Sequence, residues 1–381
     1  MRAVRFHGRG DIRVDEVEEP ICGNGQVKAS LPLLLITLPP RLSLESLTRN
    51  LGLDRFDLPL SDYVAVVNIH EYLAGPMIVP VTPHPLTDEK LPTTLGHEFS
   101  GTVEEIGSGV TGFKVGDRVV VKPNLFDGTC SNCSLGIFNC CERVAFIGFS
   151  SQAGGLSDHL VVDSRHAIPL PESIPLDIGA LVEPLAVAWH AVSRSPLQRN
   201  DTVLVVGAGP IGLAIIQVLK VKGITSIVAV EVSERRRGFA LALGATEVLN
   251  PVDVDAVTQI RALTKNAGAD VVFECSGAQA GLDTAVAGLR VRGTMVVVSL
   301  WEHRPTIDTF AVVFQEKNVI GAALYDDGDF EAVMDEIASG GIQPRPMITS
   351  KIRMEDVDVR GFKALIEERD KHVKILVDIS A

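Results

Sequence analysis

Aromatic residues, basic charge and long apolar runs are all scarce in this sequence. Its 381 residues include only three tyrosines and two tryptophans but 34 glycines, which favours tight backbone turns over aromatic stacking platforms. The 48 acidic residues outnumber the 35 basic ones, whereas a nucleic-acid-binding protein normally presents a basic face. We therefore expect no nucleic-acid partner.

No stretch approaches the roughly twenty apolar residues that cross a bilayer. The longest candidate runs only from Leu31 to Leu38, contains Pro32 and is followed by two more prolines. The N-terminal residues lack the apolar core of a secretion signal. We therefore expect no membrane segment and a cytoplasmic location.

Cysteine is sparse as well, but its distribution is informative. Of the six cysteines, Cys130, Cys133, Cys140 and Cys141 fall within twelve residues. In a chain for which we expect no export signal, such clustering favours metal binding over a disulfide framework.

The length and the changes of pattern along the chain predict two domains. A chain of 381 residues is about right for two domains of typical size. Residues 1–27 have a strand-and-turn pattern, and from about residue 95 to 170 short β-branched runs alternate with Gly, Asp and Pro turns, which indicates an all-β region. From Thr202 onwards, apolar strands alternate with helices, as in a doubly wound parallel sheet. We therefore expect an α/β protein with domains at 1–186 and 187–328 and a return to the first domain at 329–381.

A glycine-rich turn predicts a dinucleotide site in the second domain. Gly207, Gly209 and Gly212 have the G-x-G-x-x-G spacing between an apolar strand and an amphipathic helix. The first glycine allows the turn, the second lets the backbone approach a pyrophosphate, and the third lets helix and strand pack closely. With Pro210 and Ile211 they form a helix start whose free N–H groups suit phosphates. The alternative is a glycine turn with no ligand.

Glu231 ends the next strand, 19 residues after Gly212. A carboxylate there can bind both ribose hydroxyls and would repel a 2′-phosphate, which favours NAD over NADP. Arg235, Arg236 and Arg237 follow closely and weaken this preference, and we include Arg236 among the candidate cofactor-binding residues.

A second motif carries a family resemblance. Gly96-His97-Glu98-Phe99-Ser100-Gly101, followed by Gly107 and Val110, resembles the G-H-E-x-x-G-x-x-x-x-x-G-x-x-V signature of the zinc-containing alcohol dehydrogenases, the medium-chain dehydrogenase family. The resemblance covers nearly the whole chain apart from residues 29–67. Its details are similar to the polyol branch, in the segments 70–73, 127–130, 139–141 and 181–186. The resemblance implies a GroES-like β-rich catalytic domain joined to a Rossmann domain.

The resemblance also implies a catalytic metal site and a reaction. His97 matches a zinc ligand, Glu98 a ligand or its neighbour, and Glu183 a carboxylate at the metal or its water. His70 matches the histidine of a proton relay. Zinc-assisted hydride transfer from a secondary alcohol or vicinal diol to NAD is then expected. Sorbitol or xylitol is the alternative substrate, and a NAD-binding protein that no longer catalyses is the alternative function.

The chain departs from the family pattern next to His70. The family carries a ligand cysteine five residues before the relay histidine, where this sequence has Ala65. Val67 takes the place of the hydroxyl residue of the relay, and neither side chain can bind a metal or pass a proton. The segment 29–67 is leucine- and proline-rich and longer than its counterpart. We hypothesise that it is translated intron or a wrong gene model.

The cysteine cluster departs as well. Cys130, Cys133 and Cys141 match the last three of four cysteines that bind the family's structural zinc, while Asp127 stands at the first position. A carboxylate oxygen can coordinate zinc, so a site of one Asp and three Cys is expected, with a metal-free lobe as the alternative. The family also implies a homodimer or homotetramer, with sheets pairing edge to edge near residues 294–300 and 314–324.

Overall fold

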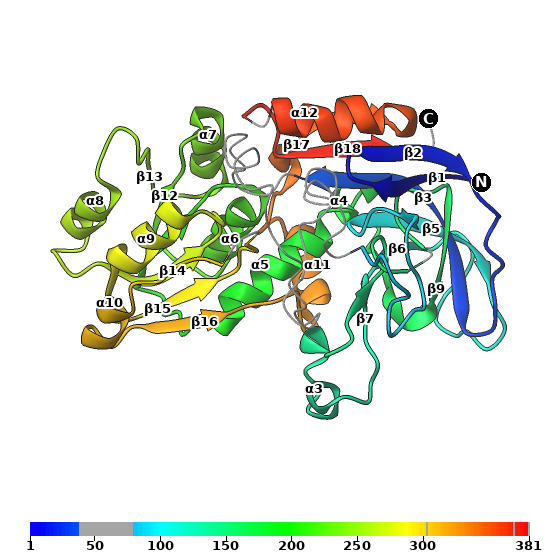
Figure 1. Cartoon of the computed structure of the whole chain (residues 1–381), viewed down its shortest axis with the longest axis horizontal. Coiled ribbons are helices and arrows are strands. Elements are labelled where there is room, and N and C mark those ends of the chain that lie inside the picture. Colours follow the sequence, from blue (N-terminus) through cyan, green and yellow to red (C-terminus); the bar gives the residue numbers. More distant parts are fainter. Residues whose placement is uncertain (38–78, 152, 302–303, 369, 380–381) are drawn as a thin grey trace. The chain divides into compact units, whose positions relative to one another are not determined.

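The computed structural model describes residues 1–37, 79–151, 153–301, 304–368 and 370–379, which divide into two compact units. Unit 1 holds the described residues of 1–37, 79–190 and 324–379, and unit 2 holds those of 191–323. Figure 1 shows their elements in chain order. His70 and the segment 38–67, which includes Ala65 and Val67, lie outside the described residues.

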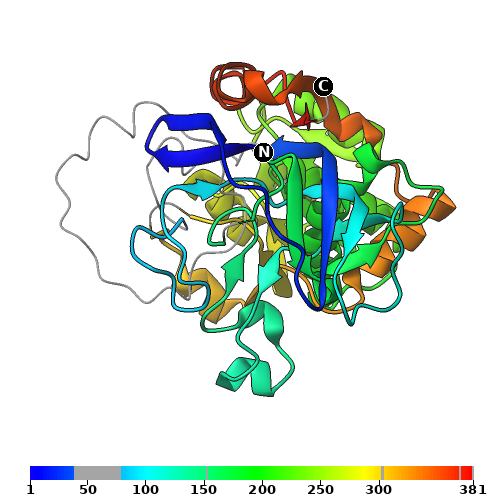
Figure 2. The same ribbon diagram turned by 90° about the vertical axis from the view of Figure 1, so that its right-hand side faces the viewer.

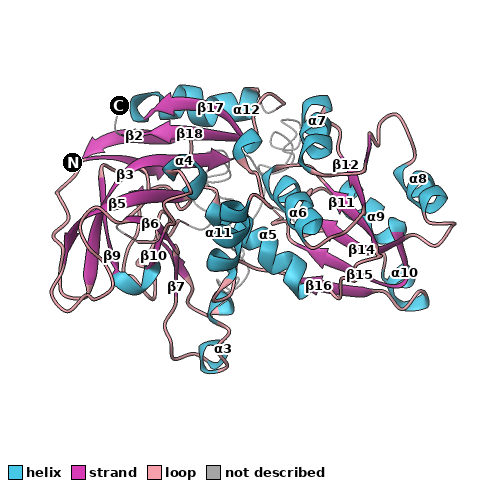
Figure 3. Cartoon of the chain, turned by 180° about the vertical axis from the view of Figure 1, so that it is seen from behind, coloured by secondary structure: helices cyan, strands magenta, loops and turns pink. Residues whose placement is uncertain are grey.

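Unit 1 consists mainly of β-sheet (Figure 3). The strands of its largest sheet are β3 (Gln26–Thr37), β5 (Phe99–Ile106), β6 (Arg118–Val121), β9 (His159–Asp163), β10 (Ala167–Pro169), β17 (Ile348–Arg353) and β18 (Lys374–Asp378). Their order is β10-β6-β5-β3-β18-β17, and β9 also pairs with β3. Because β18 pairs with β3, the last part of the chain completes a sheet begun by the first.

Smaller elements complete unit 1. One small sheet consists of β1 (Arg2–Gly8), β2 (Asp11–Glu16) and β4 (Thr93–Thr94). A second consists of β7 (Asn124–Leu125) and β8 (Ala145–Phe146). The helices are α3 (Ser131–Ser134), α4 (Leu176–Gly179), α5 (Val182–Arg194), which continues into unit 2, α11 (Asp329–Ser339) and α12 (Ala364–Glu367). Short 3₁₀ turns occur at Phe138–Cys140, Ser164–His166, Arg345–Met347 and Met354–Asp356, and a π-helical turn at Val357–Lys363.

Strand β3 differs from the sequence-based expectation for residues 29–67. Residues 29–37 are not separate from their surroundings but continue β3 and pair with β5, β9 and β18. Leu34, Leu35 and Ile36 are consecutive and all buried, as in a strand covered on both faces. Such a strand has no alternation of apolar and polar residues, which is why the pattern looked foreign. Pro32 lies where the register of β3 against β5 shifts, a place that tolerates proline.

Unit 2 is a doubly wound sheet, which confirms the predicted fold of this part of the chain. Its parallel strands are β11 (Thr202–Val206), β12 (Ser226–Val230), β13 (Glu247–Leu249), β14 (Ala269–Glu274), β15 (Leu289–Val297) and β16 (Asn318–Gly321). Their order is β13-β12-β11-β14-β15-β16, so the order reverses between β11 and β14. Ligands of such sheets bind at the carboxyl ends of the strands beside this reversal.

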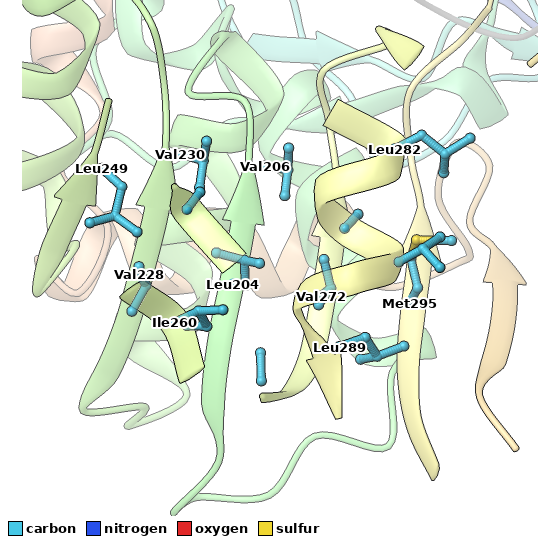
Figure 4. Close-up of a cluster of buried hydrophobic side chains, with 14 residues drawn as sticks. Leu204, Val206, Val228, Val230, Leu249, Ile260, Val272, Leu282, Leu289 and Met295 are labelled. Atoms are coloured by element: carbon cyan, nitrogen blue, oxygen red, sulfur yellow. The ribbon is translucent and has the colours of Figure 1, made fainter. Parts of the chain in front are cut away.

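The helices of unit 2 are α6 (Pro210–Val221), α7 (Glu234–Leu243), α8 (Ala256–Leu263), α9 (Gln279–Gly288) and α10 (Thr309–Phe314). Alternate residues of the strands, such as Leu204, Val206 and Val272, join residues of α8 and α9 in one buried cluster (Figure 4). The intervening residues Val203 and Val205 are also buried. Both faces of the sheet are therefore covered, as the unbroken apolar strands predict.

The edge of this sheet lies in the second of the two stretches that the sequence indicated. Residues 294–297 belong to β15, which is paired on both sides by β14 and β16. The edge strand is β16, because the strand order ends there. Residues 314–324, which the sequence also indicated, contain β16, so only the stretch 294–300 is wrong.

One helical segment of the described residues is long and apolar enough to cross a membrane. It runs from Leu176 to Arg194, covering α4 and α5, and has a mean hydropathy of 1.2. Of its most apolar window, 83% is buried inside the structure, and a core helix passes the same test of length and composition. A single such segment is weak evidence for a membrane span.

Candidate metal centres and dinucleotide loop

His97 and Glu98 are adjacent in the turn that leads into β5. Gly96, which precedes them, has φ of +101°, a region that favours glycine. A Cβ at Gly96 would lie 2.4 Å from Cδ1 of Leu34, so a larger residue would displace the side chain of Leu34. Both following side chains are buried, with His97 2% exposed and Glu98 4% exposed.

Glu183 approaches the same place from the first turn of α5. A carboxylate in the first turn of a helix is stabilised by the partial positive charge of the helix N-terminus. One donor atom from each of His97, Glu98 and Glu183 lies within 4.8 Å of the other two. The structure thus brings together the three residues that the sequence selected for a catalytic metal.

Lys374 is a residue of this cluster that the sequence analysis missed. It begins β18 and is fully buried, and its Nζ lies 2.5 Å from Oε2 of Glu98. A lysine inside the apolar run Val373–Val377 was the available signal, because a buried ammonium needs an anionic partner. The sequence could not identify that partner.

The charges of the cluster favour an uncharged imidazole. Burial lowers the pKa of His97 to about 3, and the Lys374 ammonium adds to this effect. Burial also raises the pKa of Glu183 well above its usual range, and the negative charge of Glu98 adds to that shift. His97 therefore keeps a free lone pair for a metal at neutral pH.

The chemistry of this donor set fits a divalent cation. Nδ1 of His97 is buried and has no hydrogen-bond partner among the described residues. Imidazole nitrogen and carboxylate oxygen are both ligands of Zn²⁺. Two carboxylates beside one ammonium would leave excess negative charge in a buried site when both are ionised, and a cation would compensate it.

The second cluster lies in a lobe built around α3, which extends away from the sheets of unit 1 (Figures 1 and 2). Ligand atoms of Asp127, Cys130, Cys133 and Cys141 all lie within 4.8 Å of one another. Sγ of Cys130 and Sγ of Cys141 are 3.9 Å apart. Cys140 is exposed and does not belong to this group.

Backbone N–H groups surround the donors of the lobe. Asp127 Oδ1 accepts hydrogen bonds from the backbone N–H groups of Thr129 and Cys130, while its Oδ2 accepts from Nε of Arg143 at 2.8 Å. These bonds hold the pKa of Asp127 well below its usual range. Burial raises the pKa of Cys133 to about 12, and a bound cation would oppose that shift. Four close N, O or S donors of this kind fit a tetrahedral structural ion.

The glycine turn of unit 2 joins β11 to α6. Gly207 has φ of +95°, and a Cβ at Gly212 would lie 1.9 Å from the carbonyl oxygen of Gly207. No atom lies within 4 Å of a Cβ built at Gly209, so the backbone is open there. Pro210 begins α6 and Ile211 follows it. The geometry fits the predicted roles of the glycines in binding a pyrophosphate.

Glu231 points back to this turn from the end of β12. Its Oε2 accepts from the backbone N–H of Ala208 and its Oε1 from that of Ser233, both at 2.9 Å. Arg236 is buried in α7, and Arg237 donates to the backbone carbonyls of Glu231 and Val232. The carboxylate is thus held beside the glycine turn, where a ribose would follow the pyrophosphate.

Two family models match the chain. Residues 69–172 match the alcohol dehydrogenase GroES-like domain, and residues 210–339 match the zinc-binding dehydrogenase model. The predicted combination of a GroES-like domain with a Rossmann domain is therefore confirmed.

Individual relatives match over nearly the full length. The chain is 38% identical to (R,R)-butanediol dehydrogenase of Bacillus subtilis and 35% identical to that of Neisseria gonorrhoeae, with 99% of each chain covered in both comparisons. It is also 35% identical to a probable D-xylulose reductase A of Aspergillus fumigatus, over 76% of this chain and 81% of the relative. The crystal structure of the Bacillus subtilis 2R,3R-butanediol dehydrogenase superposes with a TM-score of 0.86, covering 100% of this chain and 99% of that one. On this evidence the chain belongs to the zinc-containing alcohol dehydrogenases of the medium-chain dehydrogenase family.

Proposed function

We propose that this protein transfers hydride between a vicinal diol, such as 2,3-butanediol, and NAD at a metal centre formed by His97, Glu98 and Glu183. The observation that carries the proposal is the convergence of these three buried donors within 4.8 Å in a chain that also has the dinucleotide turn. Relatives named as butanediol dehydrogenases at 35–38% identity support the choice of substrate class. A secondary alcohol of similar size fits the same chemistry.

Zinc, when bound, would act as a Lewis acid that lowers the pKa of the substrate hydroxyl and so favours the alkoxide. The neutral imidazole of His97 and the two carboxylates would hold it. Lys374 would fix Glu98 through their ion pair, which keeps the carboxylate in one position. By resemblance, His70 would pass the released proton onward.

The Rossmann unit would orient the cofactor. The N–H groups at the start of α6 would bind the pyrophosphate, and Glu231 would accept from the ribose hydroxyls. A 2′-phosphate beside that carboxylate would be repelled, so we propose NAD and not NADP. Arg236, buried at the start of α7, remains a candidate cofactor-binding residue.

We propose further that the protein is a cytoplasmic homodimer or homotetramer that pairs through the edge of unit 2. The edge strand β16 lies beside α10 in sequence, and this region exposes Phe310, Val313 and Phe314. Their exposed fractions are 69%, 67% and 72%, and a second copy of the chain would cover such an apolar patch.

Two other functions are kept as alternatives. A polyol dehydrogenase acting on sorbitol or xylitol is favoured by the similarity to D-xylulose reductases. A catalytically impaired NAD-binding protein is favoured by Ala65 and Val67, which stand where the family has a ligand and a relay hydroxyl.

Metal analysis together with NAD-linked assays on 2,3-butanediol and on sorbitol separates the three. The proposal expects bound metal and faster turnover of butanediol. NAD binding without turnover of either substrate would instead establish the impaired protein.

A further inference from the structure

Among the described residues, the donor group of His97, Glu98 and Glu183 contains no sulfur, and this determines which cations it holds. We infer that the His97–Glu98–Glu183 centre binds its divalent cation through nitrogen and oxygen alone, and so gives up Zn²⁺ and accepts Co²⁺ or Mn²⁺ more readily than the cysteine lobe does. The inference rests on the proposed function for the presence of a metal, but not for the reaction.

The lobe cysteines belong to a different group of donors from His97. Cys130, Cys133 and Cys141 form their own group of donors with Asp127, and this group is separate from that of His97. Their sulfurs also accept backbone N–H groups of the lobe, including Cys133 N–H to Cys130 Sγ at 3.5 Å. Cys140 is exposed beside them.

The two remaining cysteines are also accounted for. Sγ of Cys22 lies 3.9 Å from the carbonyl oxygen of Glu105, seven residues along the chain from Glu98. A strand rises about 3.3 Å per residue, which places this thiol about 20 Å from the metal centre. Cys275 follows β14 in unit 2, where its side chain is buried, and it belongs to neither donor group. Residues 38–78, outside the described part of the chain, contain no cysteine in their sequence.

In the part of the chain that the structure describes, the donors that are left are one imidazole and two carboxylates. Thiolate ligands select soft cations such as Zn²⁺ strongly, whereas carboxylates suit harder ones such as Mn²⁺. Such a site still prefers Zn²⁺ to Mn²⁺ by the usual order of affinities, but its preference is smaller. The lobe, with three sulfurs, keeps the stronger preference.

Lys374 lowers the affinity of the centre further. Its ammonium lies 2.5 Å from Oε2 of Glu98, so a cation bound to Glu98 has a positive charge close by. An ammonium and a cation held by the same carboxylate repel one another appreciably in a buried site. The centre therefore combines fewer soft ligands than the lobe with a competing cation, and we expect its metal to leave first.

Cobalt spectroscopy tests the inference without an activity assay. The full-length protein is stripped with a chelator and reloaded with Co²⁺, and the spectrum of His97→Ala is subtracted from that of the wild type. The difference should contain d–d bands but no near-ultraviolet sulfur-to-cobalt band, which should persist in His97→Ala because it arises from the lobe. His166→Ala, which removes another buried histidine outside both donor groups, is the matched control and should leave the spectrum unchanged.

A second measurement covers the case in which His97→Ala does not fold. Graded chelation of the cobalt-loaded wild type should remove a first ion with no loss of the sulfur band, and a second ion together with that band. Mn²⁺ added after the first phase should re-enter the centre. Loss of the sulfur band in the first phase, or no ion that depends on His97, would overturn the inference.

Failure of the proposed function gives a different result. A protein with the sulfur-free cobalt site that turns over no diol contradicts the proposed reaction and leaves this inference standing. An active diol dehydrogenase whose His97-dependent spectrum contains the sulfur band supports the proposed reaction and contradicts this inference.

Discussion

Nζ of Lys374 lies 2.5 Å from Oε2 of Glu98, although the two residues are 276 positions apart in the sequence. Both side chains are buried, so neither can exchange its partner for water. The pair connects β18 to the turn before β5, and it holds one carboxylate of the metal centre in place. Removing one member of a buried pair leaves an uncompensated charge, which commonly costs about 3–5 kcal/mol.

Lys374→Met is therefore expected to lower the free energy of unfolding of the metal-free protein by about 3 kcal/mol. Zn²⁺ should restore more stability to this variant than to the wild type, because the cation then neutralises Glu98. Denaturant unfolding with and without chelator measures both effects. The double variant Glu98→Gln/Lys374→Met is the control and should recover part of the loss. Equal stability of the single variant and the wild type in chelator would contradict the ion pair.

The stability of the metal-free protein should depend on pH through His97. Its pKa in the folded chain is lowered from 6.5 to about 3, so the unfolded chain binds the extra proton more readily than the folded one. The contribution of His97 to the free energy of unfolding is then fully present above 6.5, the pKa of the unfolded chain, and is lost as the pH falls towards about 3.

The loss attributable to this residue should be several kcal/mol, since each pKa unit corresponds to about 1.4 kcal/mol. Denaturation of the wild type and of His97→Gln between neutral and acid pH measures it. The variant should show a shallower decline, and parallel curves for the two proteins would rule out a buried neutral imidazole.

How much the sequence could predict depended on the range of the interactions. The glycine turn at 207–212 and the cluster at 127–141 are local, so their spacing alone indicated which donors come together. The link between His97, Glu98 and Glu183 required a family resemblance, because no periodicity connects a turn before β5 to the first turn of α5. Neither local spacing nor the family resemblance indicated the partner of Lys374. Its partner is set by the pairing of β18 with β3, a long-range contact that no local pattern encodes.

The same limit explains the misread strands. The apolar run in β3 is buried on both faces, and a strand of this kind cannot be distinguished from an unrelated leucine-rich segment by its pattern. Residues 294–300 are predicted at the sheet edge together with 314–324, but the first of these stretches belongs to the inner strand β15. Position depends on which strands pair, and here β16 lies outside β15.

The lobe should lose its metal when a buried sulfur is removed, but not when an exposed one is. Cys133→Ser deletes one of the four donors within 4.8 Å, so we expect the metal content to fall by one ion per chain and Tm to fall by about 2–4 °C for each kcal/mol of stability lost. Cys140→Ser is the matched control, since its neighbour in sequence is a donor while its own side chain is exposed. Elemental analysis and thermal unfolding measure the two outcomes. Equal losses in both variants would show that Cys140 is a ligand, and no loss in either would favour the metal-free lobe.

Glu231→Gln should weaken NAD binding by about tenfold, because the loss of one charge-assisted hydrogen bond corresponds to about 1.5–3 kcal/mol. NADP binding should weaken less or improve, since the repelling charge is gone. The amide can still accept from the N–H of Ala208 or of Ser233, so the turn should remain folded. Titration calorimetry with both cofactors is the measurement, and Glu234→Gln, on the exposed face of α7, is the control. An unchanged ratio of the two affinities would mean that Glu231 does not select the cofactor.

Phe314→Asp should reduce self-association if the edge of unit 2 is the contact between copies. The side chain is 72% exposed and packs its ring against that of Phe310 with centroids 4.2 Å apart, so the pair forms one apolar surface. A carboxylate in a contact of this kind would be desolvated without a partner, which commonly costs several kcal/mol. Analytical ultracentrifugation should then show smaller species than for the wild type at the same concentration. Val252→Asp, at a residue that is 76% exposed but lies between β13 and α8, is the control and should leave the assembly intact. The β16 edge would not be the contact between copies if the wild type were monomeric at all concentrations. The same would follow if Phe314→Asp associated as the wild type does.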